Sequence, residues 1–155
     1  EMQDQLLVQG IEFEKQDFSQ DITQYYARSR KRHRWYGIEI PVHTTQDGEN
    51  ITFKLELDNS LYYGFRRPQE TRENTELDNK IIELTKLVSS SLNANPWWFG
   101  WKNPDKYHLN FWTLDSQDFD YFKHPQRRAR MVKEYAEEIA NYIREFQDIV
   151  EEQNI

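Results

Sequence analysis

Apolar and polar residues alternate from Tyr36 to Arg66, and this period of two constrains the fold more than any other feature of the chain. The alternation covers residues 36–43 and 51–57, on either side of the turn sequence TTQDGEN, and residues 61–66 after the short turn DNS. Successive residues of a β-strand point to opposite faces, so each segment predicts a strand with one apolar face. Because short turns join antiparallel strands, the three segments predict an antiparallel meander.

Helical spacing of apolar residues replaces the alternation after the meander. Between Thr75 and Leu92 they recur at steps of three and four residues, and a longer stripe follows Pro125, a residue that favours the first turn of a helix. Residues 22–32 predict a further helix after the capping residues Ser19 and Asp21. An apolar stripe lets a helix pack on a sheet, and the long stripe also suits a partner helix. The members of the long stripe are Val132, Tyr135, Ile139, Tyr142, Phe146 and Ile149.

Together these segments predict an α+β fold. Residues 97–101 predict a short aromatic strand, and residues 107–114 its hairpin partner. We therefore expect an antiparallel sheet of about five strands, the meander plus the aromatic hairpin, packed against two to three helices with a long C-terminal helix. At 155 residues we expect a single domain. Residues 1–20 are expected to be weakly structured or a remnant of an upstream region, and residues 20–155 to form the α+β domain.

The composition excludes several classes of function. The absence of cysteine excludes disulfides and thiolate metal sites. The four histidines include no pair at the i, i+4 spacing of a helical metal clamp, and neither a glycine-rich phosphate loop nor a nucleophile elbow is present. We therefore assign no catalytic residue and no cofactor. No apolar run approaches the ~20 residues that span a bilayer, so we expect a cytoplasmic protein without a membrane partner.

The stretch NPWWFGWK, residues 95–102, holds three tryptophans and a phenylalanine around one glycine. Strand alternation places Trp97, Phe99 and Trp101 on one face, either as part of a core or as a stacking platform for a base or another ring. Gly100 predicts the close approach of a packed helix or of a ligand ring. The rings that we expect at the surface, if any is exposed, are Trp98 and then Trp112.

Basic residues gather in RSRKRHR, residues 28–34, although the net charge of the chain is −7. A helix C-terminus favours such a cluster through its dipole, and the acidic last helix could pair with it. The functional alternative is contact with phosphates, supported by nearby aromatic rings that stack on bases. The residues predicted to contact nucleic acid are Arg28, Arg30, Lys31, Arg32, Arg34, Arg66, Arg67 and Trp98.

Two acidic residues are weak candidates for a metal site. Glu56 and Asp58 lie on the same side of the second strand, where two carboxylates can share a divalent cation. The alternative is a solvated strand face on which Lys54 balances the acids. The triplet Asp78-Asn79-Lys80 matches D-x-K in form, but it lies in a predicted helix and not on the strand that a metal nuclease uses.

The phrases LYYGF, residues 61–65, and WWFGWK, residues 97–102, lie between an early helix and a long terminal helix. This order resembles the C-terminal portion of bacterial proteins of the PD-(D/E)XK nuclease superfamily, over about residues 20–150. The resemblance implies a bacterial protein with relatives that are Mg²⁺-dependent endonucleases, and Mg²⁺ only where a nuclease core is present. The acid and the (D/E)-x-K strand of that core have no match in this chain, so no catalytic residue is carried over.

Three functions follow as hypotheses. The first is a non-catalytic accessory domain of a nuclease-related protein that contacts nucleic acid through residues 28–34. The second is a protein interaction or homodimerisation module that uses the C-terminal helix. The third is a metal-dependent enzyme with its site at Glu56 and Asp58.

Overall fold

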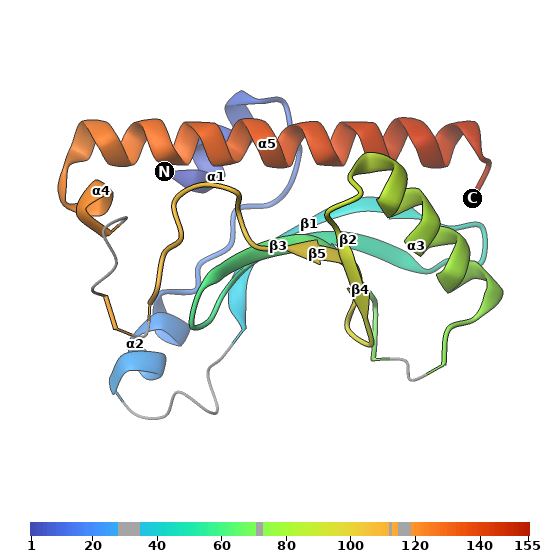
Figure 1. Ribbon diagram of the computed structural model, residues 1–155, viewed down its shortest axis with the longest axis horizontal. Coiled ribbons are helices and arrows are strands. Elements are labelled where there is room, and N and C mark those ends of the chain that lie inside the picture. Colours follow the sequence, from blue (N-terminus) through green and yellow to red (C-terminus); the bar gives the residue numbers. More distant parts are fainter. Residues whose placement is uncertain (28–34, 71–72, 112, 115–118) are drawn as a thin grey trace.

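A five-stranded sheet forms the centre of the computed structural model, which describes residues 1–27, 35–70, 73–111, 113–114 and 119–155. The strand order is β1-β2-β3-β5-β4, and each neighbouring pair is antiparallel (Figure 1). The first three strands are the predicted meander. The strands are β1 (Tyr36–Thr44), β2 (Asn50–Leu57), β3 (Leu61–Arg66), β4 (Asn93–Asn95) and β5 (Trp98–Lys102).

Three helices, α1 (Met2–Val8), α3 (Glu76–Val88) and α5 (Pro125–Glu152), lie on one face of this sheet. The long helix α5 runs across it in Figure 1, and both α1 and α3 contact α5. The predicted α+β fold with a long C-terminal helix is therefore confirmed. No helix in the described ranges is long and apolar enough to cross a membrane. The helices of these ranges are α1 (Met2–Val8), α2 (Ser19–Ala27), α3 (Glu76–Val88), α4 (Phe119–Lys123) and α5 (Pro125–Glu152).

The core lies between the sheet and α5. The inward positions of the meander are apolar as predicted, and the rings of Phe65 on β3 and Phe146 on α5 lie 4.3 Å apart. The apolar stripe of α5 is buried within the chain itself, in particular at Ile139, Ile143 and Phe146. This packing explains the stripe without a partner, and it weakens the alternative of a module that binds through the C-terminal helix.

The aromatic strand has a different partner from the one predicted. β5 pairs with the short strand β4, not with residues 107–114. The latter segment is bound elsewhere: the Tyr135 hydroxyl of α5 donates to the carbonyl of Tyr107 at 2.6 Å, and the amide of Phe111 donates to Asn59 O at 2.9 Å. The prediction of a strand over residues 107–114 was therefore wrong within the described part of that segment.

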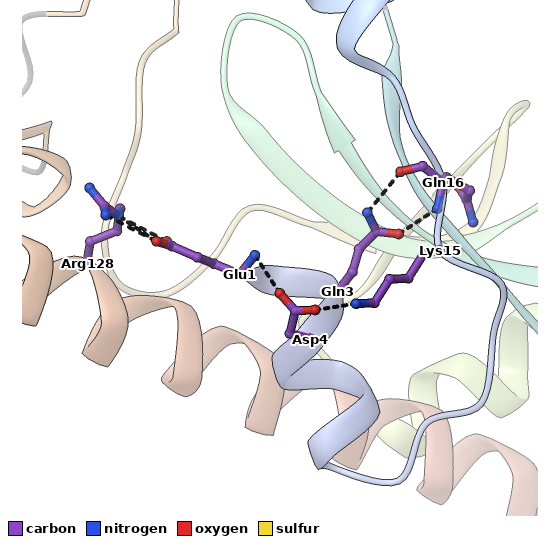
Figure 2. A network of polar contacts seen from close by, with 6 residues as sticks. All are labelled: Glu1, Gln3, Asp4, Lys15, Gln16 and Arg128. Atoms are coloured by element: carbon purple, nitrogen blue, oxygen red, sulfur yellow. Dashed lines mark hydrogen bonds and ion pairs between the residues drawn. The ribbon is translucent and has the colours of Figure 1, made fainter.

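Helix α1 occupies part of residues 1–20, the segment expected to be weakly structured. Its Leu6 is fully buried in the core, and Glu1 forms an ion pair with Arg128 of α5 at 2.9 Å. Lys15 hydrogen-bonds Asp4 and lowers the pKa of that carboxyl to about 2. Figure 2 shows these contacts, which fasten α1 to α5 and to the segment that follows it.

Two glutamine side chains link this N-terminal segment to the edge of the sheet. The amide of Gln3 both donates to and accepts from the backbone of Gln16, at 2.9 and 2.7 Å (Figure 2). The amide of Gln16 makes the same pair of bonds with the backbone of Glu39 on β1, at 2.6 and 3.0 Å. Side-chain amides thus replace a neighbouring strand at this point of β1, which is an edge strand.

Candidate functional site

A pocket of about 450 Å³ lies on the side of the sheet opposite α5. Tyr62 and Arg66 of β3 line it, and they alternate with Tyr63 and Phe65, which point into the core beneath α5. Four tryptophans form much of its wall: Trp35, Trp97, Trp98 and Trp101. The remaining lining residues are polar or acidic: Glu56, Asp58, Asn59, Ser60, Asn95 and Asn103.

A β-bulge brings two of these tryptophans onto one face. Phe65 pairs with Gly100, but Arg66 pairs with Trp98, so Phe99 is an extra residue in β5. Trp98 and Trp101 therefore face the same side, and each ring meets the Tyr62 ring edge-on at 5.8 Å. The prediction of strict alternation along residues 97–101 was wrong. The extra residue Phe99 shifts the register, so Trp98 lies on the same face of the sheet as Trp101 and not on the opposite one.

The exposure of the rings also differs from the prediction. Trp98, expected at the surface, is only 4% exposed, and Phe99 packs in the core. The exposed rings of the pocket are Trp97 and Trp35, at 46% and 51%. Trp112 lies outside the described residues. The prediction that Trp98 is exposed at the surface was therefore wrong.

Gly100 lies against a packed helix, which is one of the two neighbours predicted for it; the other was a ligand ring. A Cβ atom at this position would lie 2.7 Å from Thr85 Oγ1 on α3. The glycine therefore serves the packing of α3 on β5, and it contributes no open space to the pocket.

Glu56 is buried below the pocket and not solvated. The carboxylate accepts a hydrogen bond from the Tyr62 hydroxyl, and its Oε2 lies 3.4 Å from Lys54 Nζ and 3.5 Å from Arg66 Nη1. Burial raises the pKa of Glu56, while the bond from Tyr62 and the two cations oppose that increase. The solvated strand face expected for Glu56 and Lys54 was wrong, because both side chains are over nine-tenths buried.

The arrangement does not favour a divalent cation. Glu56 and Asp58 both line the pocket, but two cationic side chains already neutralise Glu56. Among the described residues, no group of three or more histidine, cysteine, aspartate or glutamate side chains is placed to hold a metal ion. A metal bound at Glu56 would have to displace Lys54 or Arg66 from the carboxylate.

The predicted basic residues fall into three groups. Arg66 lines the pocket, with its guanidinium 5.5 Å from the centre of the Trp98 ring. Arg67 is buried and binds inside the chain, to Asn74 at 2.8 Å and to Asp78 at 3.6 Å, and this placement weighs against its predicted contact with nucleic acid. The third group lies outside the described residues: Arg28, Arg30, Lys31, Arg32 and Arg34.

Asp78, the acidic residue of the D-x-K triplet, has a structural role at the start of α3. Asp78 and Thr75 form a reciprocal capping box at the start of α3, in which Thr75 Oγ1 accepts from the Asp78 amide at 3.0 Å. The buried carboxylate also pairs with Arg67. These contacts agree with the assignment of the triplet to a helix.

Amide side chains shape the rim of the pocket. Asn95 Oδ1 accepts from the backbone amides of Trp97 and Trp98, at 2.8 and 3.0 Å, and holds the turn that presents both rings. Asn103 Nδ2 donates to Leu61 O at 3.1 Å. Much of the polar capacity of the rim is therefore used within the chain, and the groups most available to a ligand are ring faces and the Arg66 guanidinium.

Sequence reasoning missed six members of this site: Trp35, Asn59, Ser60, Tyr62, Asn95 and Asn103. Alternation alone places Tyr62 on the side opposite the core, so that signal was present in the sequence. The position of Trp35 depends on the tertiary fold and has no local signal.

A pocket of this kind suits a flat, unsaturated ring. Tryptophan faces attract aromatic rings, and a guanidinium both stacks on rings and pairs with anions. No protein family, curated protein or solved structure matches this chain, so the resemblance to the PD-(D/E)XK superfamily stays a prediction.

Proposed function

We propose that this chain is a non-catalytic binding domain that holds an unpaired base of a nucleic acid in the aromatic pocket. The observation that carries the proposal is the exposure of Trp97 and Trp35 at the wall of a pocket that also contains Arg66. Base–aromatic stacking contributes about 1–3 kcal/mol per base in single-strand binding proteins. An arginine beside the rings supplies a partner for phosphate or a second stacking surface.

The size and chemistry of the pocket support a base over other ligands. A volume of about 450 Å³ lies within the usual range of small-molecule sites. A sugar would need several polar groups free to bind its hydroxyls, whereas the side-chain amides of Asn95 and Asn103 already bond within the chain. A stacked base uses ring surface, and Trp97 and Trp35 are 46% and 51% exposed.

Charge makes a limited contribution at the pocket itself. Lys54 and Arg66 offset Glu56, and the chain as a whole carries a net charge of −7. We therefore expect stacking to dominate at the pocket, with a modest salt dependence. In the sequence the basic cluster 28–34 ends immediately before Trp35, and this adjacency supports additional phosphate contacts. The resemblance to a nuclease superfamily agrees with a nucleic-acid ligand.

The test is fluorescence anisotropy with labelled single-stranded and double-stranded oligonucleotides. We expect the single strand to bind more tightly, because bases in a duplex are stacked on one another and closed to the pocket. Replacing Trp97 by alanine should weaken single-strand binding by about fivefold to 100-fold, from the loss of one stacking contact. Leu87→Ala is the matched control, because Leu87 is 70% exposed and does not line the pocket.

Two results would refute the proposal. One is the absence of binding to any single-stranded DNA or RNA probe at low salt. The other is binding that Trp97→Ala and Leu87→Ala reduce to the same extent.

A further inference from the structure

One polar atom below the pocket lacks the partner that its burial requires. Glu56 Oε1 accepts from the Tyr62 hydroxyl, but Oε2 is buried and has no hydrogen bond within the described residues. Its nearest cations, on Lys54 and Arg66, lie at 3.4 and 3.5 Å, which are ion-pair distances rather than close hydrogen bonds. Buried polar atoms are almost always hydrogen-bonded, so an exception at the lining of a pocket points to a donor on the ligand.

Arg66 is the neighbour that can make room for such a donor. Its side chain is 29% exposed, whereas that of Lys54 is 9% exposed and also pairs with Glu39 at 2.9 Å. The Arg66 guanidinium can turn toward a ligand phosphate or stack on the ligand ring, and this movement opens the approach to Glu56 Oε2. The Tyr62 hydroxyl meanwhile keeps the carboxylate in place.

We infer that Glu56 determines which bases the pocket accepts, and that it favours bases with an exocyclic amino group over thymine and uracil. This inference rests on the proposed function. An ionised carboxylate only accepts hydrogen bonds. Cytosine presents an amino donor at the position where thymine presents a carbonyl acceptor. The amino group of cytosine can therefore donate to Glu56 Oε2, whereas the carbonyl oxygen of thymine at the same position is repelled by it.

The experiment compares binding of the wild-type chain to oligo(dC), to oligo(dT) and to an oligonucleotide of pyrimidin-2-one, which is cytosine without its amino group. We expect oligo(dC) to bind at least about tenfold more tightly than oligo(dT), the lower end of base discrimination by one good contact. We expect the pyrimidin-2-one strand to bind within about threefold of oligo(dT), because it also lacks the donor.

The variant that tests the residue is Glu56→Gln, whose amide can both donate and accept. We expect it to reduce the preference for oligo(dC) to less than about threefold, because the amide can turn its donor toward the carbonyl of thymine. Glu39→Gln is the matched control, since it removes the other carboxylate paired with Lys54 but does not line the pocket. The control should keep the wild-type preference.

The outcomes separate this inference from the proposed function. If neither oligo(dC) nor oligo(dT) binds, the inference is overturned, and if no other single-stranded DNA or RNA probe binds either, the proposed function is overturned as well. Equal binding of the two, or tighter binding of oligo(dT), overturns the inference and leaves the base-binding proposal standing. A folded Glu56→Gln variant with an unchanged preference overturns the assignment to Glu56. If thermal unfolding shows that this variant does not fold, a pyrimidin-2-one strand that binds as tightly as oligo(dC) still overturns the inference.

Discussion

Replacing Gly64 by alanine tests how rigidly the two strands beside the pocket are joined. Gly64 lies in β3 between Tyr62 and Arg66, and it pairs with Trp101 of β5. A Cβ atom at Gly64 would lie 2.0 Å from Gly100 O and 2.6 Å from Trp101 Cα. Both atoms belong to the backbone of β5, so no rotation of a side chain relieves the overlap.

The cost follows from this geometry. Ordinary contacts between heavy atoms need about 3.5 Å, so the two backbones would have to separate by more than about 1 Å. Overpacking costs about 1–3 kcal/mol, and each backbone hydrogen bond that is lost between β3 and β5 adds roughly 1 kcal/mol. We expect Gly64→Ala to lower the free energy of unfolding by about 3 kcal/mol.

Urea unfolding followed by tryptophan fluorescence measures this change, and Gly48→Ala is the control. Gly48 has a positive φ of 85° but no atom within 4 Å of a new Cβ, so its substitution costs backbone strain alone, about 1 kcal/mol. The Gly64→Ala variant should also bind single-stranded oligonucleotides more weakly, because β3 and β5 both carry lining residues of the pocket. A loss of stability at Gly64 no larger than that at Gly48 would show that the strands separate easily and would refute the reasoning.

The remaining predictions concern the core, a helix cap and one titration, each measured by urea unfolding. Phe146→Ala should lower the free energy of unfolding by about 3–5 kcal/mol, because it leaves a cavity against the sheet. The control Glu145→Ala, at an exposed neighbouring position, should lower it by less than about 0.5 kcal/mol. Equal losses for the two variants would contradict the placement of α5. Thr75→Ala should cost about 1 kcal/mol by removing the capping box of α3, and no loss would contradict the cap. The pKa of Glu56 is raised above its ordinary value of 4.5, so its contribution to stability is present below that pH and is lost as the pH rises through the raised value. The stability of the wild-type chain relative to Glu56→Gln should therefore fall as the pH rises above 4.5 and through the raised pKa, and a constant or rising difference would contradict the burial of this carboxylate.

The meander and the long helices could be predicted because their signals are local. Each inward position of β1 to β3 follows from its neighbours in the sequence, and Phe53 and Phe65 are fully buried as the alternation requires. The cap of α3 is likewise written in adjacent residues, beginning at Thr75. An apolar period of two residues for a strand, or of 3.6 residues for a helix, depends only on residues within that one element. The type of these elements could therefore be predicted without knowledge of the tertiary packing.

The pairing of β5 with β4 could not be predicted, because the residues of β4 have little preference for a strand. The strand β4 consists of Asn-Ala-Asn, residues that are rare in strands. Its pairing with β5 depends on the tight turn that Asn95 stabilises, whereas residues 107–114 have the stronger strand composition but bond to α5 and to the turn after β2.

The pocket was only partly predictable for a similar reason. The orientation of Trp98 depends on the register between β3 and β5, and a single extra residue reverses it. The burial of Glu56 depends on Tyr62 and Arg66 of β3, which lie beside it only after β2 and β3 have paired. Contacts between strands, unlike the pattern within a strand, are not visible in a single sequence.

The glutamine that borders β1 also affects how copies of this protein behave toward one another. An unpaired edge strand is a template on which a second molecule can add its own strand, and repeated addition leads to aggregates. Because the amide of Gln16 already uses the outward groups of Glu39, a foreign strand would first have to remove the N-terminal segment. The segment that carries Gln16 thus covers this point of the β1 edge, and a proteolytic cut that released it would expose the Glu39 backbone to pairing with a strand of a second molecule.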